Sequence, residues 1–144
     1  MVASELPAVV AAIRLIWMRT NHLLGEALAE HGLTTATFQA LWALDPDAPP
    51  PSMKVMAERI YCNAPNLSFI TNQLAARGFV ERSVDPADRR SRVLVLTDKG
   101  RRARADLVRA ATENTPLGVL GDDELRQLMA LLHRAVPNPS DQPR

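Results

Sequence analysis

Residues 53–100 read MKVMAERIYCNAPNLSFITNQLAARGFVERSVDPADRRSRVLVLTDKG, and this stretch decides the fold. Apolar side chains at three- and four-residue spacing predict a short helix over 53–60 and a second helix over 64–77. Only residues 61–63 separate the two helices, and Asn63 is well suited to cap the second one. Two helices joined by so tight a turn predict a helix-turn-helix.

A charged hairpin follows the second helix, after a stop at Gly78. Strand-like segments at 79–82 and 93–96 flank a tip formed by residues 85–92, DPADRRSR. A hairpin in this position is the wing of a winged helix. The predicted fold class is therefore mainly α, an α+β winged helix-turn-helix with further helices on either side.

The second helix has one apolar side and one polar side. Its apolar side carries Leu67, Ile70 and Leu74, which we expect to face the core. The other side carries small hydrogen-bonding residues and one aromatic residue: Asn66, Ser68, Phe69, Asn72 and Gln73. Asn and Gln can pair with an adenine edge through two hydrogen bonds, and an aromatic ring can touch a thymine methyl group. This side is a candidate DNA-reading surface, with a polar helix face that binds nothing as the alternative.

Three arginines gather at the hairpin tip: Arg89, Arg90 and Arg92. A guanidinium group is planar and has several donors, which suits both phosphate and a narrow minor groove. Asp88 lies within side-chain reach of these arginines and is expected to hold one of them in position. A structural salt bridge is the alternative for any single arginine, but three arginines so close together favour contact with DNA.

The charges of the chain are unevenly distributed. The formal net charge is only +1, but residues 77–109 contain ten Arg or Lys and five Asp or Glu, a local charge of +5. The remaining residues contain seven basic and eleven acidic residues, a net charge of −4, and residues 59–80 contain no acid. A basic stretch on a nearly neutral chain is typical of a nucleic-acid-binding face, with a solvated charged helix as the alternative.

Helices on both sides of this region carry more apolar surface than a small winged domain can cover. Residues 4–31 predict one helix, capped by Ser4, stopped by Gly32 and about 40 Å long. Residues 122–136 predict a last helix with a broad apolar face. Packed together and against a second copy, such helices form a two-fold dimer, which reads a palindromic site. A simple core helix is the alternative for the first of them.

Length and composition exclude several other classes of protein. The chain has 144 residues, 47% of them apolar, which is enough for one globular domain. No apolar run is long enough for a membrane span and the N-terminus lacks the order of a signal peptide, so a cytoplasmic location is expected. The single cysteine, Cys62, excludes an internal disulfide, and the three histidines are not spaced as metal ligands. We therefore expect no metal and no other cofactor.

An enzyme is the first rival interpretation. Catalysis would need a nucleophile with a base, paired carboxylates or a phosphate-binding glycine loop. The six glycines are scattered at expected helix ends and turns, and the acids are interleaved with arginine, so we expect no enzyme. A ligand- or protein-binding winged helix that no longer binds DNA is the second rival.

The sequence resembles the MarR (multiple antibiotic resistance regulator) family of bacterial transcription factors over nearly its whole length. Residues 85–100, DPADRRSRVLVLTDKG, look like the wing signature of that family, an Asp-x-Arg followed by a strand that ends Leu-Thr-x-x-Gly. Residues 56–60 and 74–82 look like its helix and helix-exit patterns. The segment before them resembles the family at Leu33, Thr34, Phe38, Leu41 and Leu44.

The resemblance implies a winged-helix regulator that binds double-stranded DNA as an obligate homodimer and answers to a small ligand or an oxidant. We expect a repressor, with an activator as the alternative. The resemblance also implies that Arg90 enters the minor groove with Asp88 as its motif partner, and that Asn63–Asn72 is the exposed part of the recognition helix. It therefore adds three residues to the candidate DNA contacts: Asn63, Ala64 and Pro65.

The resemblance implies a division of labour within a single domain, residues 1–144. Residues 33–100 are expected to form the DNA-binding lobe, 4–31 and 101–136 the dimerisation helices, and 137–144 a flexible tail. Ligands of the family bind between the dimerisation helices and the DNA-binding lobe. The candidates for such a pocket are Trp17, His22, Phe38 and Trp42. A core role is the alternative for each of these four residues.

The chain departs from the family pattern in its recognition helix. Many members carry a Thr-Arg pair where this chain has Ser68 and Phe69, so the arginine expected in the major groove is missing and no base preference is carried over. Pro65 also removes one helix N–H. Redox-sensing members carry a reactive cysteine in the first helix, which has none here. Cys62 is interpreted as a small packing residue, with a reactive thiol as the alternative.

Overall fold

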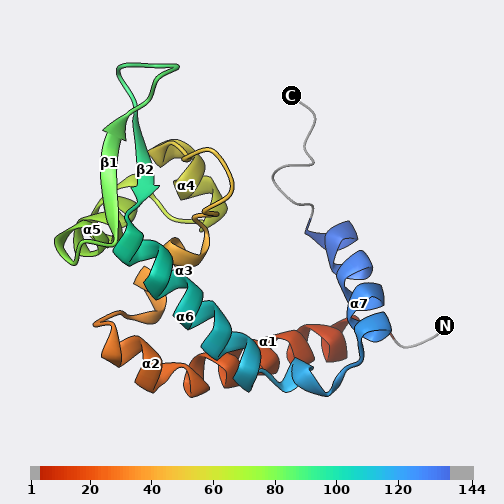
Figure 1. Ribbon diagram of the computed structural model, residues 1–144. Helices are drawn as coiled ribbons and strands as arrows, with labels where there is room; N and C mark the ends of the chain where they lie inside the picture. Colours follow the sequence, from red (N-terminus) through yellow and green to blue (C-terminus); the bar gives the residue numbers. More distant parts are fainter. Residues whose placement is uncertain (1–3, 137–144) are drawn as a thin grey trace.

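The computed structural model describes residues 4–136, which are mainly helical with one small antiparallel sheet. The elements follow one another as α1 (Leu6–Leu23), α2 (Gly25–Glu30), α3 (Thr35–Trp42), α4 (Met53–Arg59), α5 (Ala64–Ala76), β1 (Val80–Val84), β2 (Arg92–Leu96), α6 (Asp98–Asn114), the 3-10 helix η1 (Pro116–Val119) and α7 (Asp122–Ala135). The predicted fold class, a mainly α winged helix-turn-helix, is confirmed (Figure 1). The tail expected at 137–144 lies outside the described residues.

Side-chain caps begin the helices of the winged lobe, and Asn63 caps α5 as the sequence predicts. The capping residues of α3, α4, α5 and α6 are Thr34, Ser52, Asn63 and Thr97. Each side-chain oxygen accepts a hydrogen bond from a backbone N–H in the first turn, where no intrahelical partner exists. The φ angles of Gly32 and Gly78, 65° and 78°, lie in the left-handed region that glycine adopts without strain. These two glycines therefore end α2 and α5, as the sequence predicts.

The long first helix expected over residues 4–31 is divided in two at Leu24. α1 begins at Leu6 rather than at Ser4, although the Leu6 N–H donates to the Ser4 hydroxyl at 3.2 Å. Leu24 keeps helical dihedral angles and its N–H still makes the helical hydrogen bond, at 3.1 Å. Gly25, with its low helix propensity, stands directly after the break. α2 therefore follows α1 after an interruption of one residue.

One hydrophobic core joins the winged lobe to α2 and to most of α6. Its fully buried side chains include Leu24, Leu41, Met56, Leu67, Leu74, Leu94 and Leu107. The apolar side predicted for α5 accounts for two of these residues, Leu67 and Leu74. α6 contributes Ala103, Leu107 and Ala111, which are buried against the rest of this core. The boundary expected at residue 100 therefore falls within α6.

The wing is a two-stranded hairpin with its register fixed from Val80–Leu96 to Val84–Arg92. β1 begins at Val80, one residue later than expected, and runs on to Val84 at the edge of the tip. Phe79 lies before the strand and is buried in the core. The Leu94 N–H donates to the Pro51 carbonyl at 3.0 Å, which ties the loop before α4 to the outer edge of β2.

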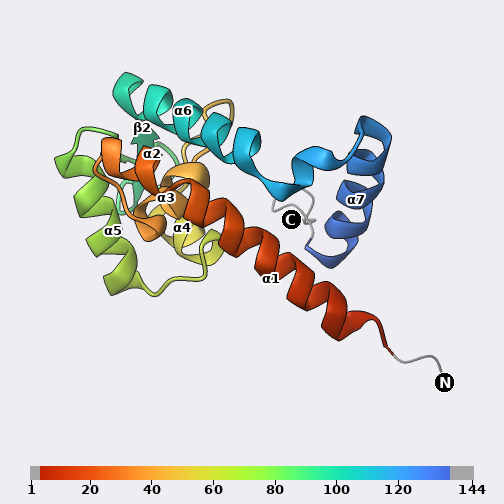
Figure 2. The same ribbon diagram turned by 90° about the horizontal axis from the view of Figure 1, so that it is seen from below.

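α1 and α7 project away from the winged lobe, as both views show (Figures 1 and 2). No residue of either helix is buried within the part of the chain that the structure describes. Large apolar side chains stay exposed on both: Val9, Ile13 and Trp17 on α1, and Leu125, Met129 and Leu131 on α7. The broad apolar face predicted for the last helix is thus uncovered in a single chain. Between residues 4 and 136, no helix combines the length and apolar character needed to cross a membrane.

Candidate nucleic-acid interface and adjoining pocket

The exposed side of α5 carries all the residues that the sequence assigns to DNA reading. These exposed residues are Asn63, Ala64, Pro65, Asn66, Ser68, Phe69, Asn72 and Gln73. Leu67, Thr71 and Leu74 face the core on the opposite side. The Asn63 side chain also caps α5, where its Oδ1 accepts the Asn66 N–H at 2.9 Å. The structure therefore brings the predicted residues together on one side of a well-anchored helix.

A side-chain contact that the sequence pattern did not predict joins this helix to the wing. Arg82 of β1 donates through Nη2 to the Thr71 hydroxyl and, at 3.4 Å, to the Ser68 carbonyl. Thr71 is fully buried, and its hydroxyl donates to the Ser68 carbonyl at 3.1 Å. The bond from Arg82 therefore gives the acceptor side of this buried hydroxyl a partner as well. α5 lies beside β1 (Figure 1), and Arg82 helps to keep the helix and the wing in a fixed relation.

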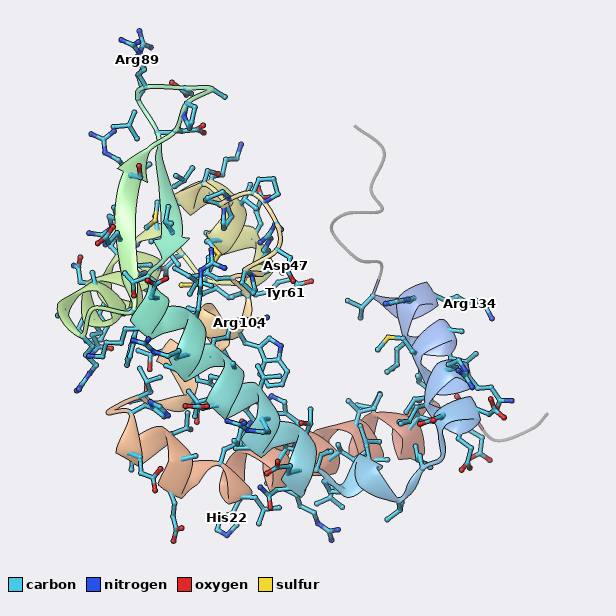
Figure 3. The ribbon with its side chains drawn as sticks, viewed as in Figure 1. His22, Asp47, Tyr61, Arg89, Arg104 and Arg134 are labelled. Atoms are coloured by element: carbon cyan, nitrogen blue, oxygen red, sulfur yellow. The ribbon has the colours of Figure 1, made fainter. Side chains whose placement is uncertain are left out.

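The wing tip is a structured turn with exposed arginines. Arg89 stands at its outer end (Figure 3). Arg90 and Arg92 are exposed as well. The Asp88 carboxylate accepts the Arg90 N–H at 3.0 Å and the Ser91 hydroxyl at 3.3 Å. Ion pairs within residues 4–136 join Arg109 to Asp106 and Arg126 to Asp123, and do not include Asp88.

The expectation that the Asp88 carboxylate holds an arginine side chain is therefore wrong in its detail. Asp88 holds the backbone of Arg90 instead, because an Asp side chain readily bonds to the N–H two residues ahead and so closes a turn. Arg92 donates through Nη1 to the carbonyls of Arg89 and Ser91, at 3.4 and 3.3 Å. Within the described residues, the guanidinium groups of Arg89 and Arg90 form no hydrogen bond and can meet a partner.

Two substitutions at Asp88 separate these two roles. Asp88→Ala removes the two hydrogen bonds that the Asp88 carboxylate accepts in the turn. We expect it to weaken DNA binding by about three- to tenfold, since each of these bonds stabilises the turn by about 1 kcal/mol. Asp88→Asn keeps the acceptor oxygen and removes a negative charge, so we expect binding at least as strong as that of the wild type. Fluorescence anisotropy on a labelled duplex measures both. Equal weakening by the two substitutions would restore the ion-pair interpretation.

Several arginines counted in the basic stretch have structural partners instead. Arg104 donates through Nε and Nη2 to the Trp42 carbonyl at 3.3 and 3.0 Å, and Arg101 donates to the Pro46 carbonyl at 3.1 Å. Outside that stretch, Arg59 of α4 likewise donates to the Ala43 carbonyl at 3.2 Å. The carbonyls at the end of α3 carry partial negative charge, which guanidinium groups stabilise. The local charge of +5 therefore overstates the charge available for DNA.

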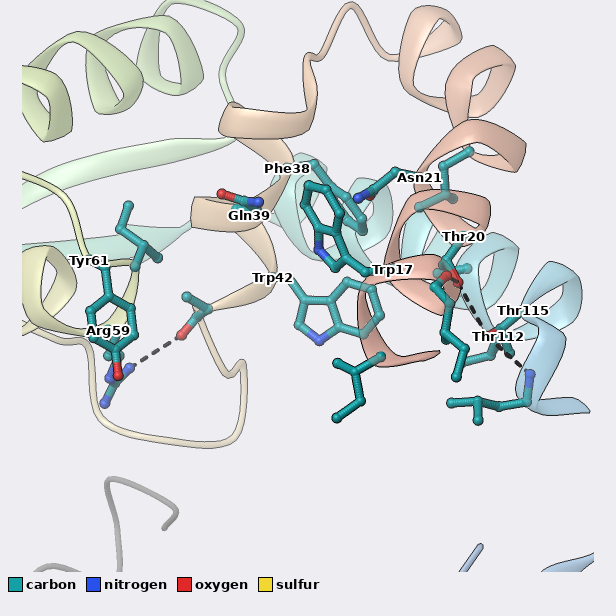
Figure 4. Close-up of a pocket in the computed structure, with 17 residues that line it drawn as sticks. Trp17, Thr20, Asn21, Phe38, Gln39, Trp42, Arg59, Tyr61, Thr112 and Thr115 are labelled. Atoms are coloured by element: carbon teal, nitrogen blue, oxygen red, sulfur yellow. Dashed lines mark hydrogen bonds between the residues drawn. The ribbon is translucent and has the colours of Figure 1, made fainter. Parts of the chain in front are cut away.

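A cavity of about 800 Å³ lies between α1, α3, the end of α4 and the end of α6 (Figure 4). Three of the four residues proposed from the sequence line it: Trp17, Phe38 and Trp42. The rings of Phe38 and Trp42 are 5.2 Å apart between centroids and tilted against each other. Apolar residues such as Ile13, Ile16 and Leu117 form much of the remaining wall. The cavity is large enough for a small organic molecule.

His22, the fourth proposed residue, does not line this cavity. It is exposed, and Figure 3 shows it at the outer edge of the molecule, away from the winged lobe. The cavity side of α1 carries Trp17, Thr20, Asn21 and Leu24, which follow helical spacing. His22 lies about 140° around the helix from Trp17 and so faces elsewhere.

Two buried donors at the wall of this cavity have no partner within the described residues. They are Asn21 Nδ2 from α1 and Arg59 Nε from α4. Leaving a buried donor unpaired costs about 1 to 3 kcal/mol, so such groups mark a place where a partner is expected. Sequence reasoning missed both residues. The available signal was an asparagine on the side of α1 that carries Ile16, Trp17 and Leu24.

Cys62 is partly buried beside the core and donates its thiol to the Asn63 carbonyl at 3.2 Å. This contact is consistent with its interpretation as a small packing residue at the start of α5. Among the described residues, no three His, Cys, Asp or Glu side chains form a group that could hold a metal ion.

Sequence comparison decides the family. A sequence model of the MarR family matches residues 31–91, from the end of α2 to the wing tip. The HTH-type transcriptional regulator YkoM of Bacillus subtilis (strain 168) is 30% identical over 108 residues, which are 74% of this chain and 70% of YkoM. The chain belongs to the MarR family. It is therefore a transcription regulator with a winged helix-turn-helix, and MarR-family proteins are not enzymes.

Solved structures of MarR-family regulators share this fold. The transcriptional repressor CouR, bound to a 23-mer DNA duplex, is 28% identical with a TM-score of 0.69, over 92% of this chain and 95% of CouR. NadR, in complex with 4-hydroxyphenylacetate, is 20% identical with a TM-score of 0.74, over 94% of each chain. The likeness to NadR shows the fold alone.

Proposed function

We propose that this MarR-family regulator is a homodimeric repressor that binds a palindromic site in double-stranded DNA and is released by a small molecule. The observation that carries the proposal is the pairing of an exposed polar recognition helix with an exposed arginine wing tip on one lobe. α5 enters the major groove, while Arg89, Arg90 and Arg92 contact the backbone and the minor groove. The DNA-bound structure of CouR supports this assignment.

The uncovered apolar faces of α1 and α7 support the homodimer. Trp17 is 53% exposed on α1, and Leu131 is 60% exposed on α7, in a chain whose core is otherwise well buried. Large exposed apolar patches on two projecting helices favour contact with another protein surface. In this proposal residues 33–100 read DNA, while 4–31 and 101–136 form the dimer, with α6 linking the two parts.

Light scattering at micromolar protein concentration tests the dimer. We expect the mass of two chains, twice the 15.8 kDa of one chain. A two-fold dimer presents its two recognition helices to half-sites that are one helical turn of DNA, or a multiple, apart. The mass of a single chain under these conditions would contradict the homodimer and, with it, the palindromic site.

The cavity between the helices supports a small-molecule effector. Its wall is mostly apolar and aromatic, and its two unpaired donors, Asn21 Nδ2 and Arg59 Nε, offer hydrogen bonds to acceptor groups. Arg59, Ile60 and Tyr61 also place the cavity at the turn that joins α4 to α5. A molecule bound there would contact the turn that positions the recognition helix. NadR, which shares this fold, forms a complex with the small molecule 4-hydroxyphenylacetate, and this supports an effector of that kind.

A substitution at Asn21 tests whether this cavity awaits a polar partner. Asn21→Leu replaces a side chain whose buried Nδ2 is unpaired with an apolar one, so we expect the free energy of unfolding to rise by about 1 kcal/mol or more in the absence of ligand. Asn72→Leu is the matched control, since it brings the same gain in helix propensity on an exposed surface. Urea denaturation at equal protein concentration measures both. If the two variants are equally stable, Asn21 has a partner that satisfies it.

Genome-wide footprinting of the protein on its own DNA tests the proposed function as a whole. We expect a small number of protected sites with inverted repeats in their centres. Repression predicts that such sites overlap promoters and that transcription from them rises when the gene for this protein is deleted. We place the protein in the cytoplasm because its proposed partner is chromosomal DNA. Protection without sequence preference would contradict the proposal.

A further inference from the structure

The recognition helix offers DNA no positive charge. From Asn63 to Ala76 its exposed side has polar, apolar and aromatic residues, but neither lysine nor arginine. Arg77 is the first basic residue, and it stands at the far end of α5 with its guanidinium against Gly32. The nearest arginine of the wing strand, Arg82, is engaged with Thr71 and Ser68. A helix that reads DNA with this surface must do so without a guanidinium or ammonium group of its own.

Phe69 stands at the centre of the exposed side of α5. Each residue turns a helix by about 100°, so Phe69 lies about 200° from both Leu67 and Thr71, which face the core. Its side chain is 63% exposed. Asn72 lies one turn further along the same side, and Asn66 lies one turn before.

The amide side chains around Phe69 are free to pair with a partner. Within the described residues, Asn66, Asn72 and Gln73 form no side-chain hydrogen bond, in contrast to Asn63, which is used as a cap. A free amide presents one donor and one acceptor side by side. Three such groups flank the ring of Phe69, with the Ser68 side chain at the edge of the same surface.

The chemistry of base edges decides what this surface fits. Guanine presents two acceptors in the major groove, and a guanidinium or ammonium group reads them best. Adenine presents a donor beside an acceptor, which an Asn or Gln amide matches, and thymine adds an apolar methyl group. We infer that α5 of this protein reads a half-site of A·T pairs, with Phe69 against a thymine methyl group and the amides of Asn66, Asn72 and Gln73 available for adenine. This inference rests on the proposed DNA-binding function and names its substrate class.

Selection from a pool of random-sequence duplexes, followed by exchange of thymine for uracil, tests the inference. Deoxyuridine differs from thymidine only by the missing methyl group, so pairing is unchanged. We expect wild-type protein to select half-sites with A·T pairs under α5. In the selected duplex, uracil at the thymine under Phe69 should weaken binding about fourfold for each methyl group lost from an apolar contact.

Variants at Phe69 make the test specific. Phe69→Ala should bind the thymine and uracil duplexes equally, while Phe69→Leu should keep part of the difference because it remains apolar. Phe69→Arg should shift selection towards guanine at the same position. Selection of G·C pairs by the wild type, or no loss of affinity on uracil exchange, would overturn the inference. If binding still fell steeply with salt, the proposed DNA-binding function would remain intact. No salt-dependent binding to any duplex would contradict both.

Discussion

Replacing Gly100 by alanine is expected to lower the free energy of unfolding by about 3 kcal/mol, the upper end of the cost of forcing extra atoms into a packed site. A Cβ atom on Gly100 would lie 1.9 Å from the Phe79 carbonyl oxygen, far inside van der Waals contact. That oxygen cannot retreat easily, because it accepts the Thr97 N–H at 3.1 Å where the wing meets α6. The glycine of the Leu-Thr-x-x-Gly pattern is therefore required by the close approach of two backbones.

Gly25→Ala is the matched control for this substitution. A Cβ atom at Gly25 meets nothing within 4 Å, and alanine favours a helix by up to about 1 kcal/mol over glycine. Urea denaturation at one fixed protein concentration should show Gly25→Ala equal to or above the wild type and Gly100→Ala well below it. Gly100→Ala at wild-type stability would mean that α6 and the wing are not packed as described.

Arg90→Ala is expected to weaken binding to duplex DNA by about ten- to a hundredfold, with the fold unchanged. Arg90 is exposed, and the Asp88 carboxylate fixes its backbone through a hydrogen bond to the Arg90 N–H. Little backbone entropy is therefore lost when its guanidinium group binds DNA. A proposed dimer carries two such tips, and both would be lost in the variant. The slope of log affinity against log salt should also fall by about 1 for each phosphate contact removed.

Arg109→Ala removes the same charge from a different place and serves as the control. Arg109 is exposed in the half of α6 that is farther along the chain from β2, and it pairs with Asp106. Surface pairs of this kind contribute little to stability, so both variants should unfold like the wild type. Mobility-shift titrations should then show a loss for Arg90→Ala alone. Equal affinities for the two variants would remove Arg90 from the DNA interface.

Local sequence signals predicted much of this fold because they act over one turn of helix. Thr34, Ser52, Asn63 and Thr97 each satisfy a nearby N–H, and Gly78 adopts a conformation that other residues avoid. These requirements are met by neighbours in the chain and are therefore visible in its sequence. The exposed side of α5 could be predicted for the same reason.

Contacts between distant segments were not predictable in this way. Arg104 bonds to the Trp42 carbonyl 62 residues away, and Arg82 bonds to the buried Thr71 hydroxyl. Nothing in the neighbourhood of these arginines distinguishes them from Arg89 or Arg90, so charge counting treated them alike. The unpaired donors of Asn21 and Arg59 likewise emerge only when α1 and α4 are brought to the same cavity.

The salt dependence of binding tests the central claim, that this protein is a sequence-specific DNA binder, most directly. Its affinity for a footprinted operator and for an unrelated duplex of equal length would be measured over a range of salt concentrations. Neutralising several phosphates predicts a loss of about a thousandfold or more between roughly 50 and 200 mM salt, with the operator bound more tightly throughout. An affinity that does not change with salt, or that is equal for both duplexes, would contradict the claim.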